Sequence, residues 1–210
     1  MARGRFITFE GGEGAGKSTQ LRLLADALAA AGIDVVATRE PGGSPGAEEI
    51  RTLLVTGEPG RWDAETEALL HFAARRDHLA RTVWPALERG AWVLCDRFAD
   101  STMAYQGYGL GLGRQRVEDL YRLVVGDFAP DLTLVIDVPA ERGLERAGAR
   151  AGNETRYERM GGTFHARLRE AFLDIAKREP QRCVVVDGSG AVDHVADLIR
   201  RAVREKLGRP

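Results

Sequence analysis

GGEGAGKS, the stretch from Gly11 to Ser18, decides the fold of this chain. It fits the pattern G-x-x-x-x-G-K-S/T, follows an apolar run from Arg5 to Glu10, and leads into a segment of helical spacing from Lys17 to Ala31. Glycines let successive backbone N–H groups turn inward around anionic oxygens, and a helix N-terminus adds unpaired donors. The sequence therefore predicts a phosphate-binding loop between a strand and a helix.

Lysine is rare in this chain, which makes the lysine of the loop informative. Of the 30 basic residues only Lys17, Lys177 and Lys206 are lysines. We expect Lys17 to reach the β- and γ-phosphates of a bound nucleotide and the Ser18 hydroxyl to ligate Mg²⁺. The predicted nucleotide-binding residues are Gly11, Gly12, Glu13, Gly14, Ala15, Gly16, Lys17, Ser18 and Thr19, and the loop alone does not decide which class of nucleotide-binding protein this is.

Short apolar runs alternate with helical stretches along the chain. Strands buried on both faces of a parallel sheet read as continuous apolar runs, and helices connect them. We therefore predict an α/β fold of the P-loop NTPase type, a three-layer α/β/α domain spanning 1–210 with a five-stranded parallel sheet covered by helices on both faces. The expected strands are Arg5–Glu10, Asp34–Thr38, Trp92–Cys95, Leu132–Val138 and Cys183–Asp187. The expected helices are Lys17–Ala31, Glu48–Val55, Ala64–Arg89 with a bend at Pro85, Arg114–Val125, Ala140–Ala149, Phe164–Lys177 and Val192–Leu207.

The segment Val93–Phe98 (VLCDRF) places an acidic and a basic residue at the end of a predicted strand. A carboxylate at this place supports Mg²⁺ and its waters, so Asp96 joins Ser18 as a predicted metal-site residue. The guanidinium of Arg97 can bridge two phosphates by bidentate contacts, which suits transfer between two bound nucleotides. The D-x-x-G and N-K-x-D segments of switch GTPases do not appear, and the alternative for Asp96 and Arg97 is a surface ion pair.

The stretch 146–162 is rich in arginine and glycine and predicts a short lid over the cleft. Arginines on a closing segment can meet the charge that shifts during phosphoryl transfer and can exclude water. The alternative is a solvated, charged helix face. The candidate lid arginines are Arg146, Arg150, Arg156 and Arg159.

Composition limits the possible classes of protein. The chain has 210 residues, 44% of them hydrophobic and 29% charged, with a formal net charge of −1. This balance argues against a general binder of nucleic acid or of membrane surfaces, which would carry a basic excess. No secretory h-region and no apolar run of membrane-spanning length occur, so we expect a cytoplasmic enzyme. Cys95 and Cys183 lie in apolar runs and are expected to be buried strand thiols.

Over nearly its whole length the chain resembles the bacterial thymidylate kinases. Besides the loop, the motifs that carry the resemblance are TREPGG at Thr38–Gly43, IRTLL at Ile50–Leu54, LLHFAARRDHL at Leu69–Leu79, CDRFADSTMAYQG at Cys95–Gly107 and PDLTLVIDV at Pro130–Val138. The resemblance implies transfer of phosphate from ATP to dTMP with Mg²⁺, giving dTDP, by a homodimer.

The resemblance also implies roles for individual residues. Lys17, Arg97, Arg150 and Arg156 match catalytic positions. By the same resemblance Arg97 also holds the dTMP phosphate, and Glu40 and Arg51 lie near that phosphate and the metal. Arg75 is implied to hydrogen-bond the thymine edge, while thymine and deoxyribose would be lined by Thr102, Tyr105 and Gln106. Glu13 is implied to approach the sugar 3′-hydroxyl. Where a stacking aromatic is usual the chain has His71, followed by Phe72, so either ring could face the base.

Three other functions remain open at this stage. A kinase for another nucleotide would lack the match of Arg75, Thr102 and Gln106 to thymine. A P-loop ATPase would couple hydrolysis to motion, and a nucleotide-binding structural protein would do no chemistry. The turn after the second strand contains Glu40–Pro41, a candidate cis peptide bond.

Overall fold

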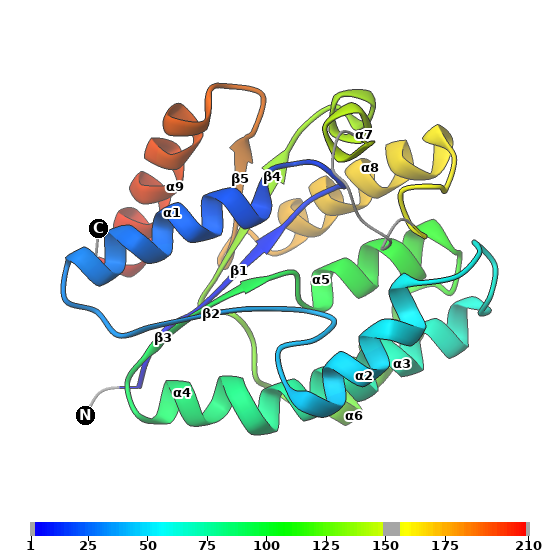
Figure 1. Ribbon diagram of the computed structural model, residues 1–210, viewed down its shortest axis with the longest axis horizontal. Helices are drawn as coiled ribbons and strands as arrows, with labels where there is room; N and C mark the ends of the chain where they lie inside the picture. Colours follow the sequence, from blue (N-terminus) through cyan, green and yellow to red (C-terminus); the bar gives the residue numbers. More distant parts are fainter. Residues whose placement is uncertain (1–2, 149–155, 209–210) are drawn as a thin grey trace.

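The computed structural model describes residues 3–148 and 156–208. A parallel sheet of five strands, in the order β2-β3-β1-β4-β5, forms its centre (Figure 1). The strands are β1 (Phe6–Glu10), β2 (Val35–Arg39), β3 (Trp92–Asp96), β4 (Leu132–Asp137) and β5 (Cys183–Asp187). The predicted α/β fold and its five strands are confirmed, with strand ends that differ from the predicted ones by about one residue.

Helices cover both faces of the sheet, as predicted. Figure 1 shows α1 (Lys17–Ala30) and α9 (Val192–Leu207) on one face and α4 (Trp84–Glu88) and α6 (Arg114–Val124) on the other. The remaining α-helices are α2 (Pro45–Val55), α3 (Ala64–His78), α5 (Ala99–Thr102), α7 (Ala140–Gly148) and α8 (Gly162–Arg178). Within the described residues, no helix has both the length and the apolar character that crossing a membrane requires.

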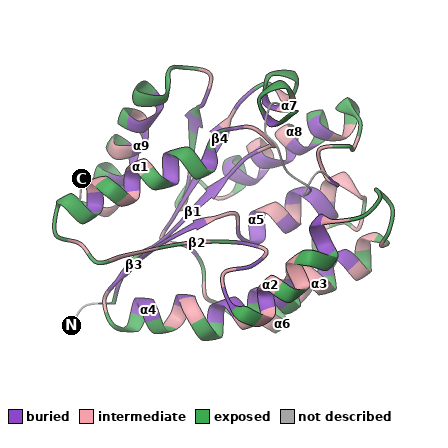
Figure 2. Cartoon of the chain, viewed as in Figure 1, coloured by how far each residue is buried: buried purple, intermediate pink, exposed green. Residues whose placement is uncertain are grey.

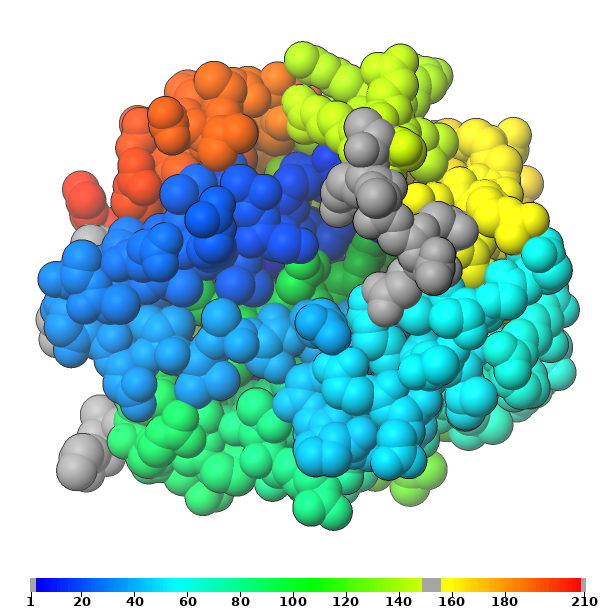
Figure 3. Space-filling model, in the orientation of Figure 1, coloured from blue at the N-terminus to red at the C-terminus, as the bar shows by residue number. Residues whose placement is uncertain are grey.

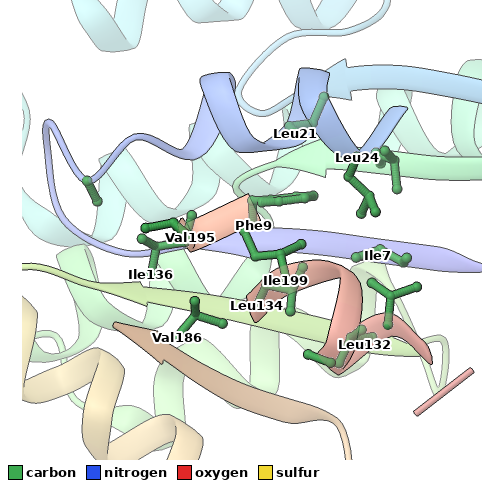
Figure 4. Packing of buried hydrophobic residues seen from close by; sticks show 14 of the residues in the cluster. Ile7, Phe9, Leu21, Leu24, Leu132, Leu134, Ile136, Val186, Val195 and Ile199 are labelled. Atoms are coloured by element: carbon green, nitrogen blue, oxygen red, sulfur yellow. The ribbon is translucent and has the colours of Figure 1, made fainter. Parts of the chain in front are cut away.

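Alternation along β1 explains how one strand serves two cores. Ile7 and Phe9 pack with α1 and α9, where Leu24 and Ile199 meet them (Figure 4). Phe6 points to the opposite face and joins a second core. Since the strands are covered on both faces, they are buried almost throughout, as the purple centre of Figure 2 shows.

The long helical region before β3 is not continuous. The sequence predicts Ala64–Arg89 with a bend at Pro85, whereas α3 is followed by a π-helical segment, η1 (Leu79–Val83), and then by α4. The amide of Trp84 bonds the carbonyl of Leu79, five residues back. Pro85 has no amide to donate, and the wider turn lets the helix continue past it.

A second π-helical segment was not predicted. It is η2 (Met103–Gly109), which follows α5 directly, and the amide of Leu110 bonds the carbonyl of Tyr105. Two glycines and the absence of a regular apolar period hide this helix in the sequence. It is buried on the side that faces the carboxyl ends of the strands, where π-turns often carry functional residues.

Candidate functional site

A cleft opens at the carboxyl ends of β1, β2 and β3. Parallel pairing sets Phe9 beside Asp96, and Arg39 beside Asp96 on the other side, so the loops after these strands meet. The cleft has a volume of 290 Å³. Figure 3 shows the hollow between the dark-blue loop after β1 and the cyan α2 segment. Its lining residues include Glu13, Gly14, Gly16, Lys17, Ser18, Thr19, Glu40, Arg51, His71, Asp96, Arg97, Ser101, Tyr105, Gln106 and Tyr157.

The predicted phosphate loop lies at the bottom of this cleft. Gly11, Gly14 and Gly16 have φ values of 132°, 65° and 93°, which only glycine adopts without strain. Lys17 Nζ donates to the carbonyl of Gly11 at 3.2 Å and to that of Gly12 at 2.8 Å. Burial, helped by the neighbouring Arg97, lowers the pKa of Lys17 to about 8. Lys17 is thus a desolvated ammonium group held against the loop, and an anion bound there would stabilise its protonated form.

The two predicted metal-site residues lie together. The Ser18 hydroxyl donates to Asp96 Oδ2 at 2.5 Å, although 78 residues separate them. A hydroxyl and a carboxylate offer the hard oxygen ligands that Mg²⁺ prefers, and Mg²⁺ usually completes its shell with waters and phosphate oxygens. The residues present therefore fit a magnesium site at the mouth of the loop.

Arg97 sits in a backbone conformation that its side chain disfavours. Its φ of 70° is the one positive value outside glycine among the described residues. The amide of Arg97 donates to the carbonyl of Phe9 at 2.9 Å. Its guanidinium donates to Gly11 O at 3.1 Å and to the Ser101 hydroxyl at 2.9 Å. Strain of this kind persists only where surrounding contacts fix it, and it is frequent at functional sites.

Glu13 and Tyr105 complete the environment of Arg97. The guanidinium donates to Glu13 Oε1 at 2.9 Å and to the Tyr105 hydroxyl at 3.0 Å, and Tyr105 donates in turn to Glu13 at 2.8 Å. Burial would raise the pKa of Glu13, but Arg97 and then Lys17 hold it at about 2. Burial raises the pKa of Tyr105, so its hydroxyl keeps its proton. The site therefore combines an ionised carboxylate, a neutral phenol and two cations.

Glu10 supports this arrangement from below and was missed by the sequence analysis. Its carboxylate is fully buried and accepts from the amide of Phe98 at 2.7 Å and from the hydroxyl of Ser101 at 2.6 Å. Burial, with Asp100 nearby, raises the pKa of Glu10 to about 8. The signal in the sequence is an acidic residue that ends an otherwise apolar strand. Glu10 holds the turn that carries Arg97.

Arg75 lies in a buried polar pocket beside the cleft. It is 2% exposed and donates from Nε to Glu40 Oε2 at 2.8 Å and from Nη2 to Thr102 Oγ1 at 3.0 Å. Its guanidinium lies between the rings of Phe72 and Phe98, at 4.7 and 5.1 Å. Nη1 has no hydrogen-bond partner in the described part of the chain. A buried donor is thus left for another acceptor.

The turn after β2 brings two more predicted residues to the site. The Glu40–Pro41 bond is cis, as the sequence suggested, and Glu40 also accepts from His78 Nδ1 at 2.9 Å. Arg51 of α2 donates to the carbonyl of Pro41 at 2.6 Å and lines the cleft.

The structure separates the two candidate stacking rings. His71 lines the cleft, and its Nε2 shares a 3.1 Å hydrogen bond with the Tyr157 hydroxyl. Burial, with Arg75 next in effect, lowers the pKa of His71 to about 3, so the ring is neutral. Phe72 is buried under the Arg75 guanidinium and does not line the cleft. Of the two rings His71 therefore faces the cleft, and Phe72 supports Arg75.

Two of the candidate lid arginines, Arg156 and Arg159, do not line the cleft. Arg150 lies outside the described residues, and Arg159 forms a surface ion pair with Glu58. Arg156 does not line the cleft: it is buried in an ion pair with Glu67 and donates to the carbonyl of Leu54 at 3.0 Å. Its position does not support a contact with a transferred phosphoryl group. The arginine-rich composition of the segment does not show which arginine has a buried carboxylate partner elsewhere in the chain, which is why the position of Arg156 was predicted wrongly.

Comparison with known proteins agrees with this geometry. The family model described as "Thymidylate kinase" matches residues 9–199. A thymidylate kinase of Caulobacter vibrioides is 57% identical, with 99% of this chain and 100% of that protein covered. One of Ruegeria pomeroyi is 54% identical over 98% of this chain and 97% of that protein. The crystal structure of the thymidylate kinase of Ehrlichia chaffeensis superposes with a TM-score of 0.80 at 36% identity, covering 96% of this chain and 99% of that one.

The match spans the phosphate loop and the Asp96–Arg97 turn, which line the cleft, and Arg75 and Thr102, which lie beside the cleft behind Glu40. The expected resemblance is therefore confirmed over the whole length of the relatives. This chain belongs to the thymidylate kinase family.

Proposed function

We propose that the chain transfers the γ-phosphoryl group of ATP to dTMP, with Mg²⁺, and releases ADP and dTDP. One observation carries the choice of acceptor: a buried donor beside the cleft and a buried acceptor in its lining are both without partners among the described residues. The donor is Arg75 Nη1 and the acceptor is Gln106 Oε1. Buried polar groups of this kind need a partner, so a ligand with the complementary pattern is favoured.

Thymine has that pattern, which uracil and guanine share. Its O4 accepts and its N3–H donates, which matches a guanidinium donor and an amide oxygen. Cytosine and adenine present the reverse order on the same edge, an acceptor at the ring nitrogen and a donor at the exocyclic amine. A site built to bond one order leaves its own groups unpaired with the other, which costs affinity. Neutral His71 on the cleft wall suits an uncharged, planar base.

The phosphate chemistry follows from the loop and from Arg97. The backbone N–H groups after Gly11 and the cation of Lys17 would hold the ATP phosphates. Mg²⁺ near Ser18 and Asp96 would supply charge compensation when bound. Arg97, already held at the cleft by Gly11 and Glu13, would bind the acceptor phosphate by exchanging one of its protein acceptors for a phosphate oxygen.

We keep Lys17 and Arg97 as the proposed catalytic residues, with Arg150 of the predicted lid 146–162. Thr102 is proposed to act through its bond to Arg75, and Tyr105 to act beside Arg97, near the deoxyribose. Glu13 is proposed to approach the sugar, and Glu40 and Arg51 to act near the acceptor phosphate.

A homodimer in the cytoplasm is proposed as the working form. Large apolar side chains are exposed on three helices, α2, α3 and α6: Leu53, Leu69 and Leu123, the last 81% exposed. Exposed apolar residues on adjoining helices support an interface. Leu123→Glu should shift the protein to a smaller species in size-exclusion chromatography with light scattering, whereas an unchanged mass would count against this surface.

The proposed activity is tested by following ADP production with ATP and Mg²⁺ and offering dTMP, dUMP, UMP, CMP, AMP, GMP and thymidine in parallel. Strong preference for dTMP is expected. Turnover of a different monophosphate would keep the phosphate chemistry but overturn the roles of Arg75 and Gln106. ADP release without any acceptor would indicate an ATPase.

A further inference from the structure

Glu67 joins three distant segments inside the protein. It lies in the first turn of α3, is fully buried, and does not line the cleft. Its Oε1 pairs with Arg156 of the segment before α8. Its Oε2 accepts from Gln106 Nε2 of η2 at 3.1 Å and from the Tyr157 hydroxyl at 3.2 Å. A buried carboxylate is costly, so three donors on one carboxylate indicate a specific task.

The bond to Gln106 decides which end of an amide faces the cleft. An amide has a donor end and an acceptor end of nearly equal shape, and only its partners determine the orientation. A carboxylate paired with a guanidinium offers acceptors only. Glu67 therefore takes the Nε2 end of Gln106, and Oε1 is left buried and without a partner in the described chain.

We infer that Glu67 is a positioning residue for base recognition: by fixing the Gln106 amide with its oxygen toward the cleft, it selects a base that donates from its ring nitrogen. The inference rests on the proposed function, since the base it concerns is that of the acceptor nucleotide. Beyond the proposed function, the inference assigns the selectivity for the base to Glu67, a residue that does not itself touch the substrate.

The contacts of Arg156 show what a substitution would do. Arg156 needs an acceptor at the Oε1 side of residue 67, because it is 2% exposed and, within residues 3–148 and 156–208, otherwise bonds only the carbonyls of Leu54 and Glu58. In Glu67→Gln the amide oxygen therefore stays with Arg156, and the NH₂ group meets Gln106. Gln106 then turns over, accepts from residue 67, and presents its own NH₂ to the cleft. That donor opposes N3–H of thymine and matches N3 of cytosine.

The test compares dissociation constants of dTMP and dCMP by calorimetry in the wild-type chain and in Glu67→Gln. The readout is the change in the ratio of the two constants from the wild-type chain to Glu67→Gln, since the contributions of Arg75 and of the phosphate are the same in both proteins and cancel in that change. We expect the preference for dTMP over dCMP to fall at least about 10-fold, because one hydrogen bond to thymine is replaced by two donors that face each other. Glu65→Gln, on the same turn but exposed and paired with Arg116, is the matched control and should leave the ratio unchanged.

Equal weakening of both nucleotides in Glu67→Gln, with an unchanged ratio, would show that Glu67 only stabilises the fold and would overturn the inference. If that variant does not fold, Gln106→Met replaces it: it removes both amide ends, so the ratio must fall, and a retained ratio overturns the inference. A wild-type chain without any preference for dTMP would refute the proposed function itself. A wild-type preference that neither variant changes would refute the inference alone.

Discussion

Replacing Arg156 by methionine separates the two roles that this residue could have. The sequence predicts an arginine that acts on the transferred phosphoryl group, whereas the structure places it in the interior. Arg156 and Glu67 are 2% and 0% exposed, and Arg156 also donates to two backbone carbonyls, those of Leu54 and Glu58. Methionine keeps the apolar stem and removes the charge.

The expected cost follows from this burial. Removing one partner of a buried, hydrogen-bonded ion pair costs about 3–5 kcal/mol, since the other charge stays behind in the interior. That is a large part of the roughly 5–15 kcal/mol by which domains are stable. For a chain of this length each kcal/mol lowers Tm by about 2–4 °C, so Arg156→Met should lower it by about 6–20 °C.

The assay is urea unfolding followed by circular dichroism, together with calorimetry for Tm. Arg159→Met is the matched control, because its pair with Glu58 is half exposed and should contribute less than about 1 kcal/mol. The double variant Arg156→Met/Glu67→Leu should recover part of the loss, since no charge is then left unpaired, while the amide of Gln106 and the hydroxyl of Tyr157 each lose the acceptor that Glu67 provides. Stability unchanged within about 1 kcal/mol in Arg156→Met, with a large loss of kcat, would refute the structural role and support the catalytic one.

Three further changes test the loop and the cleft wall. Lys17→Ala should remove most of kcat while circular dichroism stays native, and unchanged turnover would remove the loop from the mechanism. Gly14→Ala should destabilise the protein by at least about 1 kcal/mol, because φ of residue 14 is 65° and a Cβ there would lie 1.8 Å from the carbonyl oxygen of Gly143. Gly12→Ala is the control and should not destabilise the protein, since no atom lies within 4 Å of a Cβ at that position. Equal free energies of unfolding of the two variants in urea would contradict this reasoning. The pKa of His71 is lowered from 6.5 to about 3 in the folded chain, so between pH 6.5 and 3 the unfolded chain binds one more proton at this ring and the free energy of unfolding decreases as the pH is lowered. His71→Asn should make this decrease smaller. If the two proteins lose stability equally over this pH range, His71 is not its cause.

Local patterns in the sequence predicted the frame of the molecule well. The strand–loop–helix unit around the phosphate loop depends on neighbouring residues, and the buried strands are short apolar runs between turn residues. In a parallel sheet the residues that follow the strands gather at the carboxyl-terminal ends of the strands, and Ser18 and Asp96 do meet there.

Residues whose role comes from a distant partner could not be predicted in this way. Gln106 was expected to line the base pocket, but its orientation depends on Glu67, 39 residues earlier in the chain. Arg156 was expected in the cleft because lid composition favours it, but 89 residues separate it from the carboxylate that holds it. Glu10 was not considered, since a single acidic residue at a strand end has many possible roles.

These buried side chains have a common role. A phosphoryl-transfer site gains from charged groups that are already in place when charge shifts, because reorganisation then costs nothing during the reaction. In this chain Arg97 is fixed through Ser101, which Glu10 holds, and Gln106 is fixed by Glu67. In both cases the buried carboxyl group of a glutamate behind the cleft orients the residue that faces it. Selectivity and catalysis should therefore be as sensitive to Glu10 and Glu67 as to the residues that contact substrate.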